Sequence, residues 1–337
     1  MLCMILVSCT GQKTGKENDN NDKIAIEVGE IKFPPQDVLQ LKSYYLSSSV
    51  HVDSIDYLIG YNYRLHSLDC MNLKSKSVTQ IVLPGDGPDA IVRLSGIYAQ
   101  SLDSVWISDE SERAFLIDSV GTIKRMIDLK KYLEDQEQLL INTNYAMFTS
   151  HLFYNASRHS LMFLVKHTPS NTFIVKEAFI DEVGKMATYQ LSSSKVVPDM
   201  SKGYAYINFP NVNFVGENIV YNYPVESSIY MLDIRTNERK YILADSHYTS
   251  NIIEKCTTSG DYATLEKHWL ENSHFYDIMY LPKYKIYARL HADKVDFDEK
   301  KGMEKLINER DLYLMLFDEN MEKIGETKLS NCRYSPF

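Results

Sequence analysis

The chain has 337 residues, enough for one large all-β domain or two average domains. Its 36 Lys and Arg against 45 Asp and Glu give a net charge of −9 without a basic cluster, which argues against nucleic acid as a partner. The 24 Tyr and 13 Phe favour strands, because aromatic side chains pack well on a pleated surface. The five cysteines lack the close spacing of a zinc site, so we expect small buried side chains, not metal ligands.

The N-terminus has the pattern of an export signal. Residues 1–9 are apolar and end at Cys9, and residues 10–23 are polar. The apolar stretch is shorter than the roughly 20 residues that span a membrane. Its last four residues, LVSC, resemble the bacterial lipobox, in which the cysteine is lipidated and becomes the mature N-terminus.

We therefore predict a signal remnant over residues 1–9, a flexible tether over 10–23 and a lipid anchor on Cys9. Thr10 replaces the Asp that often marks inner-membrane retention, so the expected location is the outer membrane, facing the periplasm or the cell surface.

One phrase recurs five times along the chain: an apolar strand that ends in Asp, a polar turn, and a second strand that closes on Leu or Ile. Each copy predicts a β-hairpin whose Asp accepts backbone amides of the following turn. The five residues are Asp69, Asp118, Asp181, Asp233 and Asp318. Allowing for insertions, their spacing is comparable with propeller blades of about 40 to 50 residues.

A further strand pair precedes each hairpin, most clearly within 149–165 and 275–290. Four antiparallel strands per repeat are what a propeller blade requires, whereas a two-sheet sandwich does not repeat such a phrase. We therefore predict that residues 24–337 form a single all-β domain, a β-propeller of about six four-stranded blades.

Three stretches depart from the strand pattern. Residues 261–273 and 299–309 place apolar side chains at helical spacing and predict short helices inserted on a blade. Residues 130–140 predict a further helical turn between blades.

Two segments carry a resemblance to a known family. The loop PGDGPDAI over 84–91 precedes a strand, and residues 310–329 form the closing hairpin. With the lipobox, they resemble the domain-of-unknown-function 4221 family, six-bladed propeller lipoproteins of gut anaerobes. The resemblance implies a propeller lipoprotein and no known activity. Because members usually continue past 334–337 into further strands, we expect an incomplete last blade, or one partly rebuilt by residues 24–33.

The sequence contains no known catalytic or cofactor motif. The nine histidines form no HExxH pattern, and the chain has no GxSxG elbow, Walker loop or dinucleotide fingerprint. We therefore expect neither a metal nor a cofactor. The loop from Gly85 to Pro88 fits an anion cradle of backbone amides and fits a tight turn between blades equally well.

Three residues lie on strands that we assign to the innermost position of a blade: His151, Tyr206 and Asp277. We take them as candidate binding residues at the channel mouth, with inner-strand packing as the alternative. Four tyrosine pairs have the same two interpretations. Their rings stack on a sugar or protein ligand, or they pack between blades. The pairs are Tyr44 with Tyr45, Tyr61 with Tyr63, Tyr221 with Tyr223, and Tyr284 with Tyr287.

The favoured function is a non-catalytic binding protein of the cell envelope with a glycan or protein ligand. The alternative is a propeller hydrolase or lyase acting on a polysaccharide. That alternative requires His, Arg, Tyr or paired carboxylates gathered in one pocket.

Overall fold

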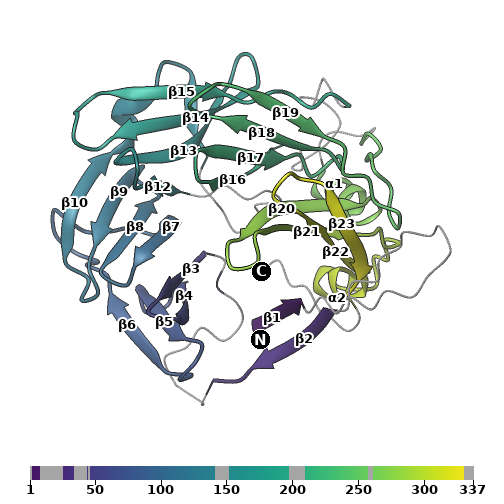
Figure 1. Cartoon of the computed structure of the whole chain (residues 1–337), viewed down its shortest axis with the longest axis horizontal. Coiled ribbons are helices and arrows are strands. Elements are labelled where there is room, and N and C mark those ends of the chain that lie inside the picture. The colour runs from purple at the N-terminus through teal and green to yellow at the C-terminus, as the bar shows by residue number, and fades with distance from the viewer. Residues whose placement is uncertain are drawn as a thin grey trace.

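The computed structural model describes residues 2–7, 26–33, 44, 46–140, 152–196, 209–256 and 261–329. Its described strands form six antiparallel sheets, of which five are blades that stand around a common centre, as in a β-propeller (Figure 1). The strands follow in chain order within and between the sheets, so each sheet is one blade built from one continuous stretch of sequence.

Blades 1, 2, 4 and 5 have four strands each. Blade 1 contains β3 Ser47–Val52, β4 Ile55–Asn62, β5 Ser67–Asn72 and β6 Val78–Val82. Blade 2 contains β7 Leu94–Ser101, β8 Ser104–Asp109, β9 Arg113–Ile117 and β10 Ile123–Asp128. Blade 4 contains β16 Asn211–Val215, β17 Asn218–Asn222, β18 Ile229–Asp233 and β19 Arg239–Ile242. Blade 5 contains β20 His274–Leu281, β21 Ile286–Ala292, β22 Leu312–Phe317 and β23 Lys323–Lys328.

Blade 3 differs because its first strand is split in two. Both parts pair with the same second strand, one near each end of it. The strands are β11 Glu137–Leu139, β12 Phe153–Asn155, β13 Ser160–His167, β14 Thr172–Phe179 and β15 Met186–Gln190.

The prediction of about six blades was too high, because the described residues form five. The remaining place in the ring, between blade 5 and blade 1, holds a sheet of only two strands, β1 Leu2–Val7 and β2 Ile26–Ile31 (Figure 1). Blade 5 itself is complete, and the expected incomplete last blade corresponds to this two-stranded sheet after blade 5. The segment 24–33 supplies β2, which pairs with β1 and not with a strand of blade 5.

Apolar side chains from adjacent blades pack against each other, as the repeat pattern predicts. Successive side chains of a strand point to opposite faces, so a central strand serves two neighbours. In β8, Ile107 packs in the cluster shared with blade 1 and Trp106 in the cluster shared with blade 3. In β13, Phe163 faces blade 2 and Leu164 faces blade 4.

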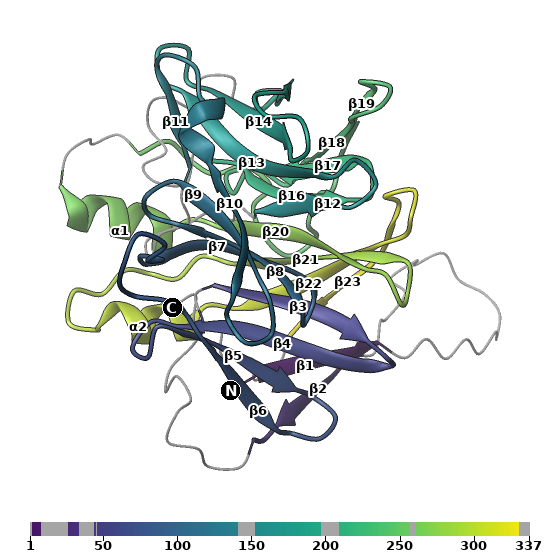
Figure 2. The same cartoon turned by 90° about the vertical axis from the view of Figure 1, so that its left-hand side faces the viewer.

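Two faces of the ring carry different connections (Figure 2). Neighbouring strands within a blade are antiparallel, so successive connections alternate between the two faces. The connection from the second to the third strand of a blade and the connection from one blade to the next therefore lie on the same face. We call this side the loop face; its described connections are 63–66, 83–93, 110–112, 129–136, 168–171, 191–196, 223–228, 243–256 and 293–311. The opposite hairpin face carries only short turns, at 53–54, 73–77, 102–103, 118–122, 156–159, 180–185, 216–217, 234–238, 282–285 and 318–322.

The described helical elements all lie in loop-face connections, close to where the sequence predicts them. They are the 3-10 helix η1 Leu129–Tyr132, α1 Tyr262–Leu270 and α2 Met303–Glu309. Helix α1 begins at Asp261, whose carboxylate accepts the amide of Thr264 at 2.7 Å. Across the described part of the chain, no helix has the length and hydropathy of a membrane span.

Three of the five repeated aspartates cap their turns as predicted. Asp118, Asp233 and Asp318 each accept two backbone amides of the turn that follows. Asp69 does not, because it lies within β5 and accepts the side chains of Tyr44, Asn62 and Gln80.

The turn of the first hairpin is capped by a different residue. Asn72 accepts the amides of Lys74 and Ser75, three residues after the predicted position. Asp181 also differs from the prediction, since its carboxylate contacts the Arg125 and His159 side chains.

Candidate functional site

The structure describes one of the predicted binding residues. Asp277 lies half-buried in β20, the first strand of blade 5, where a bulge between Phe275 and Ile278 shifts the register with β21. His151 and Tyr206 lie outside the described residues, as does Cys9. Whether the three candidates form one site therefore stays a prediction.

The tyrosine pairs divide between packing and exposure. Tyr61, Tyr221 and Tyr223 are buried between blades. Tyr63 on the loop face and Tyr284 on the hairpin face are 48% and 40% exposed.

The loop from Gly85 to Pro88 forms a tight turn between blades 1 and 2. The amide of Ala90 donates to the carbonyl of Gly87, and the amide of Ile91 donates to that of Pro84. Gly87 has a φ of +91°, which favours glycine at this position.

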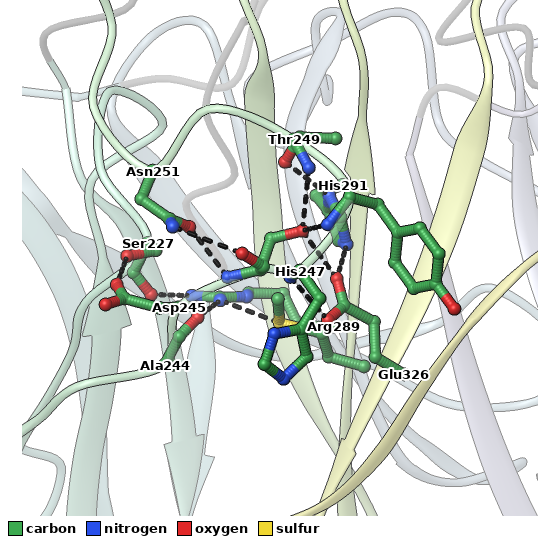
Figure 3. A network of polar contacts seen from close by, with 12 residues as sticks. Ser227, Ala244, Asp245, His247, Thr249, Asn251, Arg289, His291 and Glu326 are labelled. Carbon is green, nitrogen blue, oxygen red and sulfur yellow. Dashed lines mark hydrogen bonds and ion pairs between the residues drawn. The ribbon is translucent and has the colours of Figure 1, made fainter. Parts of the chain in front are cut away.

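A polar network that sequence reasoning missed lies between blades 4 and 5 (Figure 3). At its centre is Arg289 of β21, which is fully buried. One terminal nitrogen donates to the carbonyl of Ser227 and the other to that of Ala244, so the guanidinium joins two segments of blade 4 to blade 5. The rings of Phe275 and Phe317 lie 4.9 and 5.8 Å from its Cζ.

The positive charge of Arg289 is matched by acids of the same interface. Burial lowers the pKa of Arg289, and the carboxylates of Glu326, Asp245 and Glu226 oppose that shift. Burial in turn raises the pKa of Glu226, whose Oε1 accepts the Tyr230 hydroxyl at 3.0 Å. The interface thus holds acids and a cation that stabilise each other.

Glu326 of β23 connects this interface to a loop of blade 4. Its Oε1 accepts the Ser246 hydroxyl at 2.6 Å and lies 2.9 Å from His291 Nε2. Its Oε2 accepts the His247 amide at 3.0 Å and Lys323 Nζ at 2.9 Å. Burial raises the pKa of Glu326, but these hydrogen bonds outweigh burial and lower it to about 2. Glu326 is therefore ionised at neutral pH.

His291 lies within an aromatic stack beside that carboxylate. Its ring stacks on Phe275 and Tyr313 at centroid distances of 5.5 and 5.1 Å, and its Nδ1 lies 3.2 Å from the Thr249 hydroxyl. Burial lowers the pKa of His291, and the hydrogen bond to Glu326 only partly opposes this. The imidazole is consequently neutral at neutral pH.

A further buried carboxylate lies in blade 3. Glu177 accepts Arg158 Nε at 2.8 Å, the Ser160 hydroxyl, and the Tyr189 hydroxyl at 2.7 Å. Burial and the bond to Glu177 raise the pKa of Tyr189. This tyrosine therefore stays a donor at neutral pH.

Comparison with known families identifies the chain. The sequence model of DUF4221, a domain of unknown function, matches residues 17–328. The chain belongs to the DUF4221 family.

Solved structures agree with this assignment. A DUF4221 member from Bacteroides vulgatus ATCC 8482 matches with a TM-score of 0.69 and 15% identity, over 88% of this chain and 84% of that one. A protein from Bacteroides fragilis NCTC 9343 matches with a TM-score of 0.53 and 14% identity, over 88% and 74%. At these identities the likeness shows the fold alone. A comparison with curated proteins gives no match.

The network of this DUF4221 propeller contains residue types that hydrolases use, in a different arrangement. Ser246 donates to Glu326 and not to His291, and its oxygen accepts the amides of Tyr248 and Thr249. A serine nucleophile instead needs a base that accepts its hydroxyl proton. The Ser246 hydroxyl thus holds the loop against blade 5.

Sequence reasoning could have found part of this network. Arg289 and His291 are polar residues at alternate positions of an otherwise apolar strand, which marks a buried polar face. Their partners come from another blade, and no spacing rule predicts that contact. Within the described ranges, no three His, Cys, Asp or Glu side chains gather as a metal site requires.

Proposed function

We propose that this DUF4221 propeller is a non-catalytic binding module of the bacterial cell envelope that recognises its ligand with the loop face. The observation that carries the proposal is the division between the two faces. The longer connections and the described helices leave on the loop face, whereas the hairpin face has short turns. In repeat proteins, insertions on one face often form the binding surface.

The state of the buried polar groups supports binding over catalysis. General acid–base catalysis requires a group whose pKa lies near the working pH and that reaches the substrate. Glu326, with a pKa of about 2, is buried and fully used in hydrogen bonds, and His291 is buried and neutral. Both groups serve the contact between blades 4 and 5.

Two exposed tyrosines on the loop face suit a glycan ligand. Tyr63 of blade 1 is 48% exposed, and Tyr248, which follows blade 4, is 49% exposed. An exposed tyrosine can stack on a sugar ring and hydrogen-bond through its hydroxyl. Tyr284 on the hairpin face, 40% exposed, offers a matched control.

A panel of immobilised plant and mucin polysaccharides tests the binding role. We expect one or more to bind the chain without release of reducing ends, with binding lost in the Tyr63→Ala/Tyr248→Ala double variant and kept in Tyr284→Ala. Cleavage of a polysaccharide, or equal loss in both variants, would contradict the proposal. Absence of binding to the whole panel would contradict a glycan ligand.

The envelope location rests on the lipobox-like residues that end at Cys9. The Bacteroides fragilis protein of similar fold is named as a candidate exported protein, which supports the same location. A chain cleaved before Cys9 would lack β1 and keep β2. Lipidation would then attach the ring to the outer membrane through the segment that precedes β2.

Membrane fractionation of cells that express the chain tests the anchor. The unaltered chain should fractionate with membranes, and Cys9→Ala should move it to the soluble fraction. Replacement of the buried Cys70 by Ala serves as the matched control and should leave the chain with membranes. Membrane association of the Cys9→Ala chain would contradict lipid anchoring.

A further inference from the structure

A buried arginine on the loop face has a donor that no protein group uses. Arg310 follows α2, and its residue surface is 7% exposed. Its Nε and Nη2 donate to the carbonyls of Asp293 and Asn272, each at 2.7 Å, and its Cζ lies 5.1 Å from the Trp269 ring centre. Its Nη1 has no hydrogen-bond partner. An unused donor in a buried site costs free energy unless something occupies it.

The charge of Arg310 is also not neutralised by an ion pair. Among the described residues no carboxylate forms a salt bridge with this guanidinium. The Asp293 carboxylate attracts it from nearby, but its Oδ1 accepts the amide of Lys294 at 2.8 Å. Burial lowers the pKa of Arg310, yet an arginine stays protonated in proteins. A buried positive charge therefore remains in the corner formed by α1, the residue after α2 and the start of β20.

Trp269, His274 and Tyr276, which also lie near Arg310, add donors and no carboxylate. Trp269 Nε1 donates to His274 Nδ1 at 3.2 Å, which leaves the imidazole proton on Nε2. Burial, with a contribution from Arg310, lowers the pKa of His274 to about 3, so this histidine is neutral. The Tyr276 ring lies 4.6 Å from the His274 ring.

We propose that this corner binds one small anion, of the size of a halide or a carboxylate group, with Arg310 Nη1 as its main donor. A water molecule would satisfy the donor but would leave the charge in place. An anion accepts the hydrogen bond and also neutralises the charge, and such a charge-assisted hydrogen bond is stronger than a neutral one. The site takes its residues from α1, from β20 and from the residue after α2, and it does not depend on which ligand the rest of the loop face recognises.

Crystals of the chain soaked in sodium bromide give the direct test. An anomalous difference peak within hydrogen-bonding distance of Arg310 Nη1 is the expected result. Density for an ordered water without anomalous signal at that position would overturn the proposal. This readout uses the unaltered protein and does not depend on whether a variant folds.

Thermal unfolding tests the same site in solution and separates the two kinds of anion. Sodium chloride and sodium acetate are each compared with sodium HEPES, whose anion is bulky, at equal ionic strength. A tenfold excess over the dissociation constant should raise the Tm by about 2 °C. A larger shift with acetate points to a carboxylate, and a larger shift with chloride points to a halide.

The variant Arg310→Met should abolish this shift, while Arg235→Met, at an exposed arginine of the hairpin face, should retain it. No shift for the unaltered chain, or an equal shift for Arg310→Met, would contradict the site.

Discussion

The two buried arginines of this propeller are held in different ways. Arg289 lies between blades 4 and 5 among the carboxylates of Glu326, Asp245 and Glu226. Arg310 lies on the loop face, where the acid that attracts it is Asp293. Both arginines donate to two backbone carbonyls, and each has one nitrogen without a hydrogen-bond partner, so the difference lies in the surrounding charges. The comparison shows that the interface between blades 4 and 5 surrounds its arginine with three acids, whereas the loop-face arginine has one carboxylate, that of Asp293, acting on it.

The largest effect is expected from Arg289→Met. The change leaves three acids and two backbone carbonyls in a buried interface without their cation. Removing one partner of such a buried arrangement costs about 3 to 5 kcal/mol. Urea unfolding at pH 7 measures the loss of unfolding free energy.

Arg310→Met is the matched comparison and should cost about 2 kcal/mol or less. It removes two hydrogen bonds to carbonyls, each worth about 1 kcal/mol net, and also removes a buried charge. If both substitutions cost the same, the two arginines are not held differently.

His274 should make the free energy of unfolding depend on pH. Its pKa is lowered from 6.5 to about 3, so below pH 6.5 the unfolded chain binds a proton that the folded chain does not. Stability should fall as the pH drops from 6.5 towards 3, by about 1.4 kcal/mol per pH unit from this residue. Urea unfolding at pH 6.5, 5.5 and 4.5 measures the slope.

His274→Phe should reduce that slope by the contribution of one proton. An equal slope in His274→Phe and the unaltered chain would show that His274 is not buried in its neutral form.

Glu326→Gln should cost up to about 3 kcal/mol at pH 7, because the pKa shift of this carboxyl is worth about 1.4 kcal/mol per unit. The folded pKa of Glu326 is lowered from 4.5 to about 2, so its stabilisation is present above pH 4.5 and is lost as the pH falls through 2. The difference between the unaltered chain and Glu326→Gln should therefore shrink below pH 4.5. Glu322→Gln, at an exposed position before the same strand, is the control.

Local patterns predicted the hairpins, because a strand, a turn-capping Asp and a second strand are neighbours in sequence. The Asp118, Asp233 and Asp318 turns follow this rule. The number of blades could not be predicted in the same way. It depends on what fills the ring between blade 5 and blade 1, and there β1 pairs with β2 across a long separation in sequence.

The buried network was beyond local patterns for a related reason. Polar residues in the apolar strand β21 mark Arg289 and His291 as unusual, but Ser246 and Glu326 come from different blades. The unused nitrogen of Arg310 depends on the direction of a side chain, which sequence does not record. Of the residues named as binding candidates, Asp277 alone is described, and its role remains a prediction.

A double-mutant cycle tests most directly whether the interface between blades 4 and 5 neutralises its own charges. Arg289→Met and Glu326→Gln, alone and combined, should show a coupling free energy of about 1 kcal/mol or more in urea unfolding at pH 7. Arg310→Met combined with Glu326→Gln should be additive within about 0.5 kcal/mol. Additive effects for Arg289 and Glu326 would contradict the shared network, as would strong coupling between Arg310 and Glu326.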